Sequence, residues 1–148
     1  MIPDRFTSDN VGFISNNDRQ DIVKSIQDEY WPHIRAKGYY LVVKPYVRPE
    51  KNDGLMLTES MRYEDQHHSV AAQVIDIGPV AYSYGDTCGN VSWAQVGDWV
   101  FIPRVAGARV AIKKNGTDVM LRIVKEDDII ATIKDPSEWE IRITTTKF

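Results

Sequence analysis

Short runs of β-branched and aromatic residues, separated by turn signals, fill most of the chain from residue 39 onward. This pattern is typical of a small antiparallel barrel or sandwich. The strongest turn is Asn115-Gly116, because both residues tolerate positive φ and two apolar runs flank them. We therefore predict a mainly β fold, with strands at 39–43, 70–77, 99–102, 109–113, 119–124 and 129–133 and a hairpin excursion over 81–93.

The two ends of the chain depart from this pattern. Residues 1–16 are polar and without periodicity, which predicts a loosely held arm. A short helix to about Tyr30 follows, since its apolar residues keep helical spacing and Pro32 stops it. This helix either packs under the β domain or lines an enclosed cavity. After residue 135, Trp139, Ile141 and Ile143 alternate with polar residues, which predicts a C-terminal strand added to a sheet edge or to a neighbouring subunit.

Length, charge and cysteine content limit the classes of function and partner. A chain of 148 residues suits one domain with extensions. The net charge of -3, without a block of Lys and Arg, argues against nucleic acid as a partner. The single cysteine, Cys88, excludes an intrachain disulfide framework. No apolar run approaches the ~20 residues that cross a bilayer, and the first residues lack a secretory pattern, so we expect no membrane partner and a cytoplasmic protein.

Three large apolar residues, Leu55, Met56 and Leu57, lie within the polar and turn-forming stretch 50–65. One interpretation is a short barrel strand with Leu55 and Leu57 on one face. The other is a solvated segment whose apolar residues dock on a partner. Gly54 would let the backbone turn just before these residues.

Five motifs follow one another along the chain: Tyr40-Leu-Val-Val-Lys-Pro45, Asp53-Gly-Leu-Met-Leu-Thr58, Gln73-Val-Ile-Asp-Ile-Gly78, Val96-Gly-Asp-Trp-Val-Phe101 and Glu126-Asp-Asp-Ile-Ile-Ala131. In this order they resemble the GroES family of co-chaperonins. The resemblance covers about residues 35–134. Valine-glycine-aspartate turns and aliphatic triplets are common separately, so their shared order and spacing carry the resemblance. The chain departs from the family at Val105-Ala-Gly-Ala108, where the family often has glycine-tyrosine-glycine.

The resemblance implies a GroES-like small β-barrel with a mobile loop at about 50–69 and a roof hairpin at about 79–95. Residues 1–34, with the short helix, and 135–148, with the C-terminal strand, would be extensions of this domain. The enlarged ends are similar to those of divergent co-chaperonins encoded by bacteriophages, which would place the protein in the host cytoplasm.

The same resemblance implies a non-enzymatic lid without cofactor or metal. A heptameric ring would cap a GroEL-type chaperonin ring in a cycle driven by the chaperonin's ATP, and would enclose an unfolded client protein. The aromatic roof residues would either pack within the subunit or against neighbours, or face the chamber. By resemblance, the chaperonin-binding residues are Gly54, Leu55, Met56, Leu57 and Thr58, and the roof residues are Tyr82, Tyr84 and Trp93.

An energy comparison favours many identical loops over one. Burying a Leu or Met side chain yields roughly 1.5 to 3 kcal/mol. Ordering a loop costs about 1 to 2 kcal/mol per residue in backbone entropy. A single loop should therefore bind weakly, whereas a closed ring that presents several loops to a symmetric partner gains avidity.

Two other functional classes remain open from the sequence. The chain could be a structural β-barrel assembly protein, such as a virion component. It could also be a metal-dependent hydrolase that uses His67 and His68 beside Glu64 and Asp65, although adjacent histidines in a strand point to opposite faces. No nucleotide-binding or nucleophile-elbow motif is present. At the turn before residue 99, we expect Asp98 to cap backbone N–H groups.

Overall fold

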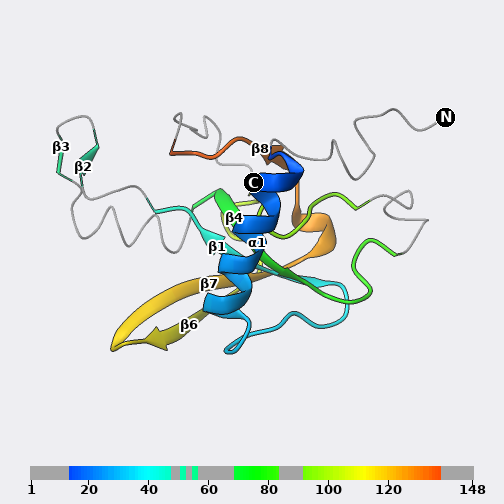
Figure 1. The fold of residues 1–148 in the computed structure, drawn as a ribbon, viewed down its shortest axis with the longest axis horizontal. Coiled ribbons are helices and arrows are strands. Elements are labelled where there is room, and N and C mark those ends of the chain that lie inside the picture. Colours follow the sequence, from blue (N-terminus) through cyan, green and yellow to red (C-terminus); the bar gives the residue numbers. More distant parts are fainter. Residues whose placement is uncertain (1–13, 48–50, 53–54, 57–68, 84–91, 138–148) are drawn as a thin grey trace.

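A computed structural model describes residues 14–47, 51–52, 55–56, 69–83 and 92–137 of the protein. In this part of the chain, one helix and an antiparallel six-stranded sheet form the body, and a separate two-stranded sheet lies beyond it (Figure 1). The elements are α1 (Asn16–Tyr30), β1 (Tyr40–Pro45), β2 (Lys51–Asn52), β3 (Leu55–Met56), β4 (Ala71–Ile77), β5 (Trp99–Phe101), β6 (Ala108–Lys114), β7 (Thr117–Lys125), the 3₁₀ turn η2 (Glu126–Asp128) and β8 (Ala131–Ile133).

The six-stranded sheet has the order β6-β7-β1-β4-β5-β8. The predicted mainly β class is therefore confirmed. The predicted barrel is not closed by hydrogen bonds in the described residues, because the order ends at β6 and β8 without a ladder between them. The short length of β8, with three residues, limits how far that edge could extend a ladder.

Alternation along the strands gives the sheet two apolar faces. On β1, Leu41 and Val43 face one side and Val42 faces the other. The first face packs against residues between the strands, Tyr82, Ala94 and Ile129, and the second packs against α1. The two buried clusters are Leu41, Val43, Ala72, Val74, Tyr82, Ala94, Val100, Ile102, Val124 and Ile129 on the first face, and Ile26, Tyr30, Ala36, Val42, Ile75 and Leu121 on the second.

A β-bulge on β4 assigns residues to these faces. Val42 pairs with Asp76 and Val43 with Val74, so Ile75 is the extra residue. Because a bulge sets two residues against one, the alternation shifts at this point. Ile75 packs under α1, and the next residue, Asp76, accepts hydrogen bonds from Arg35 and from the N–H of Ala36 at 3.0 and 2.7 Å. The bulge thereby fixes the chain that enters β1.

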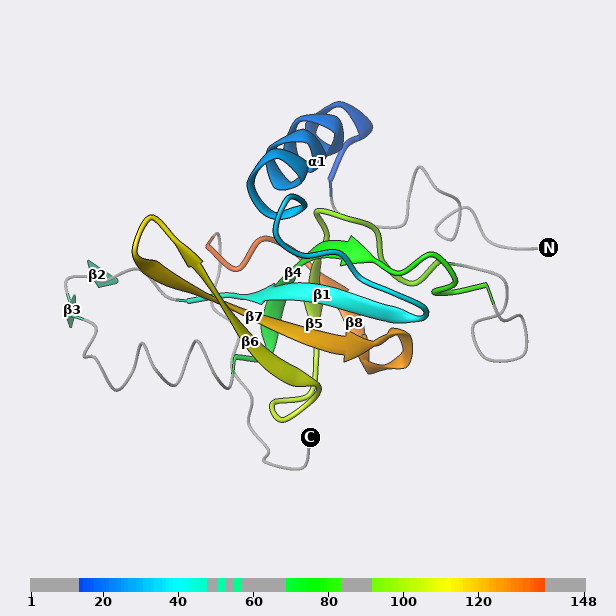
Figure 2. The same ribbon diagram turned by 90° about the horizontal axis from the view of Figure 1, so that it is seen from below.

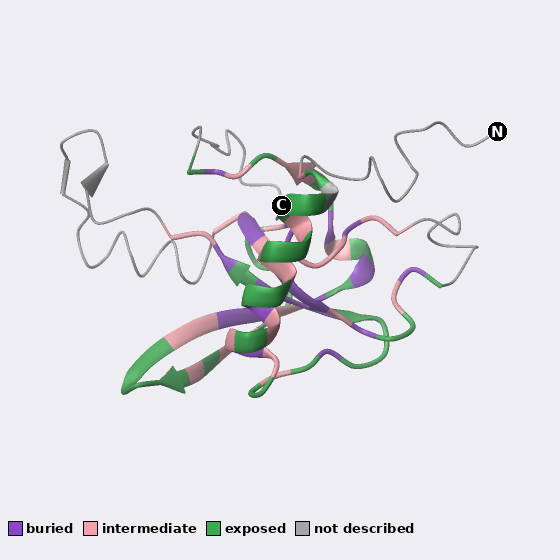
Figure 3. Ribbon diagram, viewed as in Figure 1, coloured by how far each residue is buried: buried purple, intermediate pink, exposed green. Residues whose placement is uncertain are grey.

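Helix α1 begins where a side chain caps it and lies on the second face of the sheet. Ser15 is the N-cap, and its hydroxyl accepts the N–H of Asp18 at 3.3 Å. Ile26 and Tyr30 are buried against the sheet, and the outer side of the helix is exposed (Figures 2 and 3). The helix ends at Tyr30, as the position of Pro32 predicted. Of the two roles open to this helix, packing against the β domain is the one observed.

Three further predictions concern the C-terminal part of the chain. The turn at Asn115-Gly116 is confirmed, since both residues have positive φ (52° and 81°) and Lys114 pairs with Thr117. The predicted last strand is shorter than expected, since β8 begins at Ala131 rather than at Ile129. The C-terminal strand predicted at Trp139, Ile141 and Ile143 lies outside the described residues.

Gly78 provides a test of the packing at the end of β4. A Cβ at this position would lie 2.2 Å from the carbonyl oxygen of Gly38, a backbone atom that has little freedom to move. We expect Gly78→Ala to lower the free energy of unfolding by about 3 kcal/mol, as overpacking does. Urea denaturation followed by circular dichroism would measure the change.

The matched control is Gly116→Ala, because a Cβ there meets nothing within 4 Å although φ is +81°. Only the left-handed backbone opposes that substitution, at a cost of about 1 to 2 kcal/mol. An equal or larger loss in the control would contradict the steric account of Gly78.

Candidate functional site

The connection between β1 and β4 is the longest in the described sheet. It leaves at Tyr46 and returns at Ser69, although the two strands are direct neighbours with Pro45 paired to Ala72. Connections longer than about 12 to 15 residues are uncommon in compact domains and are usually either functional segments or linkers. We call it the β1–β4 connection and call Tyr46 and Ser69 its base.

Within this connection, Leu55 and Met56 form β3, which pairs only with β2 in the described ladders. Asn52 pairs with Leu55 and Lys51 with Met56, and the residues between them are Asp53-Gly54, a pair that two-residue hairpins favour. The resulting two-stranded sheet is separate from the six-stranded one and lies away from it in both views (Figures 1 and 2). Leu55 and Met56 are therefore not in a strand of the main sheet. Gly54, Leu57 and Thr58 lie outside the described residues.

Main-chain and aromatic contacts hold the base of the β1–β4 connection. The N–H of Tyr46 donates to the carbonyl of Ala71 at 2.8 Å, which continues the β1–β4 ladder by one bond. The ring of Tyr46 meets Trp99 edge-on, with centroids 5.9 Å apart. The hydroxyl of Ser69 bonds to both the N–H and the carbonyl of Ala71 at 3.3 and 2.9 Å.

A buried arginine also contacts this base. Arg122 on β7 is 0% exposed, and its guanidinium donates to the carbonyl of Ser69 at 2.7 Å. Burial lowers the pKa of Arg122 to about 10, so the group still carries its charge at neutral pH. Its other acceptors are the carbonyl oxygens of Pro103 (2.9 Å), Arg104 (3.1 Å) and Ala106 (3.2 Å from Nε).

The second predicted site, the roof, begins at an unusual residue. Tyr82 has a positive φ of 62°, which a bulky residue rarely adopts. Buried Glu126 accepts its N–H, and the Tyr82 hydroxyl donates to the Glu126 carbonyl at 2.9 Å. These bonds fix the backbone just before residues 84–91, which lie outside the described part.

The roof aromatics that the structure describes pack on one another. Tyr82 is 6% exposed and its ring lies 5.8 Å from that of half-buried Trp93, with both against the first apolar cluster. A side chain so buried offers little surface to an enclosed client. Of the alternatives for the roof residues, Tyr82 therefore fits packing within the subunit. Tyr84 lies outside the described residues.

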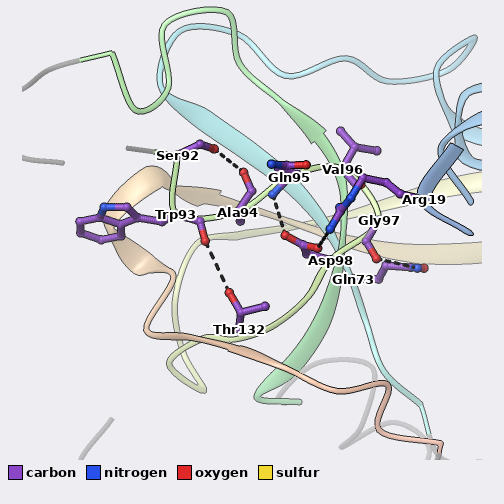
Figure 4. Close-up of polar contacts among 10 residues, drawn as sticks. All are labelled: Arg19, Gln73, Ser92, Trp93, Ala94, Gln95, Val96, Gly97, Asp98 and Thr132. Atoms are coloured by element: carbon purple, nitrogen blue, oxygen red, sulfur yellow. Dashed lines mark hydrogen bonds and ion pairs between the residues drawn. The ribbon is translucent and has the colours of Figure 1, made fainter. Parts of the chain in front are cut away.

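Asp98 has the capping role predicted for it and a further partner. Its carboxylate accepts the N–H of Gln95 at 2.9 Å and forms an ion pair with Arg19 of α1 at 2.7 Å (Figure 4). Arg19 also donates to the carbonyl of Val96 at 3.1 Å, and Gln73 donates to that of Gly97 at 3.3 Å. This network ties α1 to the turn before β5 and leaves Asp98 only 1% exposed. Asp98 therefore has a structural role.

The described residues do not test the metal-binding interpretation. His67 and His68, with Glu64 and Asp65, lie outside them, and the described part holds no group of three or more His, Cys, Asp or Glu side chains placed to bind a metal. Among the same residues, no helix combines the length and apolarity needed to cross a membrane.

Sequence reasoning did not identify Arg122 or Glu126 as site residues. A signal was present for Arg122, since it interrupts the apolar run from Val119 to Val124 at a position that alternation assigns to the interior. Glu126 gave no such signal, because it stands in an acidic turn that resembles a solvated one.

No protein-family model matches this chain, and no curated protein matches it.

Glu126 can be tested by its effect on stability. Glu126→Ala removes the acceptor of the buried Tyr82 N–H, and we expect a loss of about 2 kcal/mol in the free energy of unfolding. Glu126→Gln keeps an acceptor oxygen without the charge and should lose less. Chemical denaturation would measure both variants.

Asp127→Ala serves as the control, since Asp127 is the exposed neighbour in the same turn. Surface substitutions of this kind usually change stability by no more than about 0.5 kcal/mol. If Glu126→Ala behaved like the control, the hydrogen bond between the Tyr82 N–H and the Glu126 carboxylate would contribute nothing to stability.

Proposed function

We propose that this protein is a co-chaperonin. Copies of the chain form a heptameric ring that caps a GroEL-type chaperonin ring and closes a folding chamber around an unfolded client, while the chaperonin's ATP drives the cycle. The site of action is the host or cell cytoplasm, and the docking residues are Gly54, Leu55, Met56, Leu57 and Thr58. The protein itself carries out no chemistry.

The observation that carries this proposal is the position of Leu55 and Met56. They lie in a hairpin that is separate from the six-stranded sheet, on a connection between two adjacent strands. A core strand would bury these residues within the main ladder. Apolar residues on an excursion of this length fit a segment that binds a partner.

The positions of the other motifs agree with the same proposal. Tyr40–Pro45 is β1, and the motif that ends in Gly78 contains β4. The valine-glycine-aspartate motif makes the buried turn that starts β5, and Glu126–Asp128 forms η2 before β8. The chain order of these elements is therefore compatible with a GroES-like barrel, in which the first apolar cluster would be the barrel interior.

Ring geometry explains why a weak contact would suffice. Two or three aliphatic side chains per subunit gain only about 1.5 to 3 kcal/mol each on burial, and part of this is lost to ordering the segment. In a ring that faces a partner of matching symmetry, each contact after the first is intramolecular, so the total affinity is high while each contact stays reversible.

Introducing negative charge at the apolar positions tests the docking residues. The double variant Leu55→Asp/Leu57→Asp replaces apolar anchors with carboxylates that resist burial, and we expect it to lose ATP-dependent co-sedimentation with a GroEL-type chaperonin. Negative-stain images of the variant should still show rings, because Leu55 belongs to β3, which is separate from the six-stranded sheet.

The matched control is Asn52→Asp/Gln66→Asp, which adds the same charge to the β1–β4 connection and keeps Leu55-Met56-Leu57. It should bind like the wild type. If the Leu55→Asp/Leu57→Asp variant also co-sediments like the wild type, docking through this triplet is wrong. Wild-type protein that neither forms rings nor binds a chaperonin would end the proposal.

A further inference from the structure

We propose that Arg122 is a positioning residue that fixes the base of the β1–β4 connection and so sets the direction in which the docking segment leaves the sheet. This inference rests on the proposed function for its consequence in binding, but its structural part can be tested without a partner. It is carried by the hydrogen bonds of one buried guanidinium to two segments that are distant in sequence, Ser69 and residues 103–106.

Stability of the β domain alone does not call for an arginine at this position. Moving a charge out of water costs several kcal/mol, and replacing buried charged groups with apolar residues of similar volume is often neutral or stabilising. The neighbouring buried positions on the same face, such as Val124 and Val43, are apolar. Among the described residues, the hydrogen-bond partners of Arg122 are main-chain carbonyl oxygens. The side chain is therefore suited to holding backbone segments in place.

The contact with Ser69 extends the ordered part of β4 outward. Ladder bonds hold the chain as far as Val70, whose carbonyl accepts the N–H of Ile102 at 2.8 Å. Arg122 adds a charge-assisted bond one residue farther along, at the last described position before the connection. Without it, the orientation of the chain at Ser69 would depend on the local bonds between Ser69 and Ala71.

The same guanidinium holds the turn after β5. The carbonyls of Pro103, Arg104 and Ala106 converge on it, and the N–H of Ala106 donates to Pro103 at 3.1 Å. This turn follows β5 directly, so it is attached to the sheet. Arg122 links Ser69 to this turn. One side chain thus connects the base of the docking segment to the sheet through two routes, β7 and the turn at 103–106.

A fixed base matters for binding because only some orientations of the segment can meet a partner. If loss of Arg122 reduced the fraction of competent orientations to one-tenth, the apparent Kd would rise about tenfold. In a ring, this factor would apply at each contact.

The experiment compares Arg122→Met, which has similar length and no donors, with Arg122→Lys, which keeps the charge but has fewer donors in a different geometry. Leu121→Ala is the control, since Leu121 is the adjacent buried residue on β7 and faces the α1 side. It loses core packing without touching the carbonyls that Arg122 binds. Measurements are made on the full chain, at a temperature where all variants are folded.

Hydrogen exchange gives the partner-independent result. In Arg122→Met, we expect the amides of Ile102 and Ala106 to exchange at least about tenfold faster than in wild type, while those of Gly78 and Val80, at the other end of β4, stay within about twofold of it. Arg122→Lys should be intermediate. In Leu121→Ala, the exchange rates of Ile102 and Ala106 should not increase more than those of Gly78 and Val80.

Binding to a GroEL-type chaperonin with ATP gives the second result. The apparent Kd should rise at least about tenfold for Arg122→Met, because the factor applies at every contact of the ring, less for Arg122→Lys, and least for Leu121→Ala. Unchanged exchange at Ile102 and Ala106, or equal weakening by Arg122→Met and Leu121→Ala, would overturn the positioning role. Should wild-type protein not bind at all, the co-chaperonin proposal fails and the exchange data alone decide whether Arg122 fixes the base.

Discussion

Buried charges that bind the backbone are the interactions on which both long excursions of this fold depend. A charged group in a protein interior is tolerated when hydrogen bonds satisfy it, and β7 with the turn after it supplies two such groups. Arg122 donates to the carbonyl at the end of the β1–β4 connection, and Glu126 accepts the N–H of Tyr82 before residues 84–91. The positive Arg122 binds a carbonyl oxygen, the negative end of the peptide dipole, and the negative Glu126 binds an N–H, the positive end. Each gives a long excursion a defined starting direction that apolar contacts, which are not directional, cannot provide.

The sheet itself separates its two faces by a local irregularity in β4. The bulge at Ile75 lets two successive residues face α1, so that an apolar side chain fills the helix interface while Asp76 binds the chain entering β1. On the other face, Leu41, Val43 and Val74 remain in register with the residues around β5 and β7. The helix is fastened at its two ends, by Arg19 to Asp98 and by the indole of Trp31 to the carbonyl of Ile75. It therefore covers an outer face that would otherwise expose an apolar patch.

Much of this fold followed from local signals in the sequence, and what did not follow depends on tertiary contacts. The Asn115-Gly116 hairpin, the end of α1 before Pro32 and the capping by Asp98 each rest on interactions within a few residues, so the sequence predicted them. The bulge at Ile75 depends on pairing between strands far apart in the chain and leaves no local signal. The open edges at β6 and β8 were not expected, because closure depends on strand lengths and tilt that alternation alone does not determine. For the candidate site, the sequence left two interpretations of Leu55 and Met56 open, a barrel strand or a docking segment, and it did not identify the residues that anchor their connection.

The two excursions leave β4 at opposite ends, which has a consequence for how a lid could work. The β1–β4 connection ends just before Ala71, and the segment that leads to Tyr82 begins just after Ile77, so the seven residues of β4 separate them. At about 3.3 Å per residue, this is roughly 20 Å of ladder. If one end docks on a partner ring while the other closes the top, the strand between them must hold a constant distance and need not transmit any rearrangement. Arg122 and Glu126 lie toward the same two ends of the sheet, each bound to backbone rather than to the other. Changes at one base should therefore leave the other unaffected.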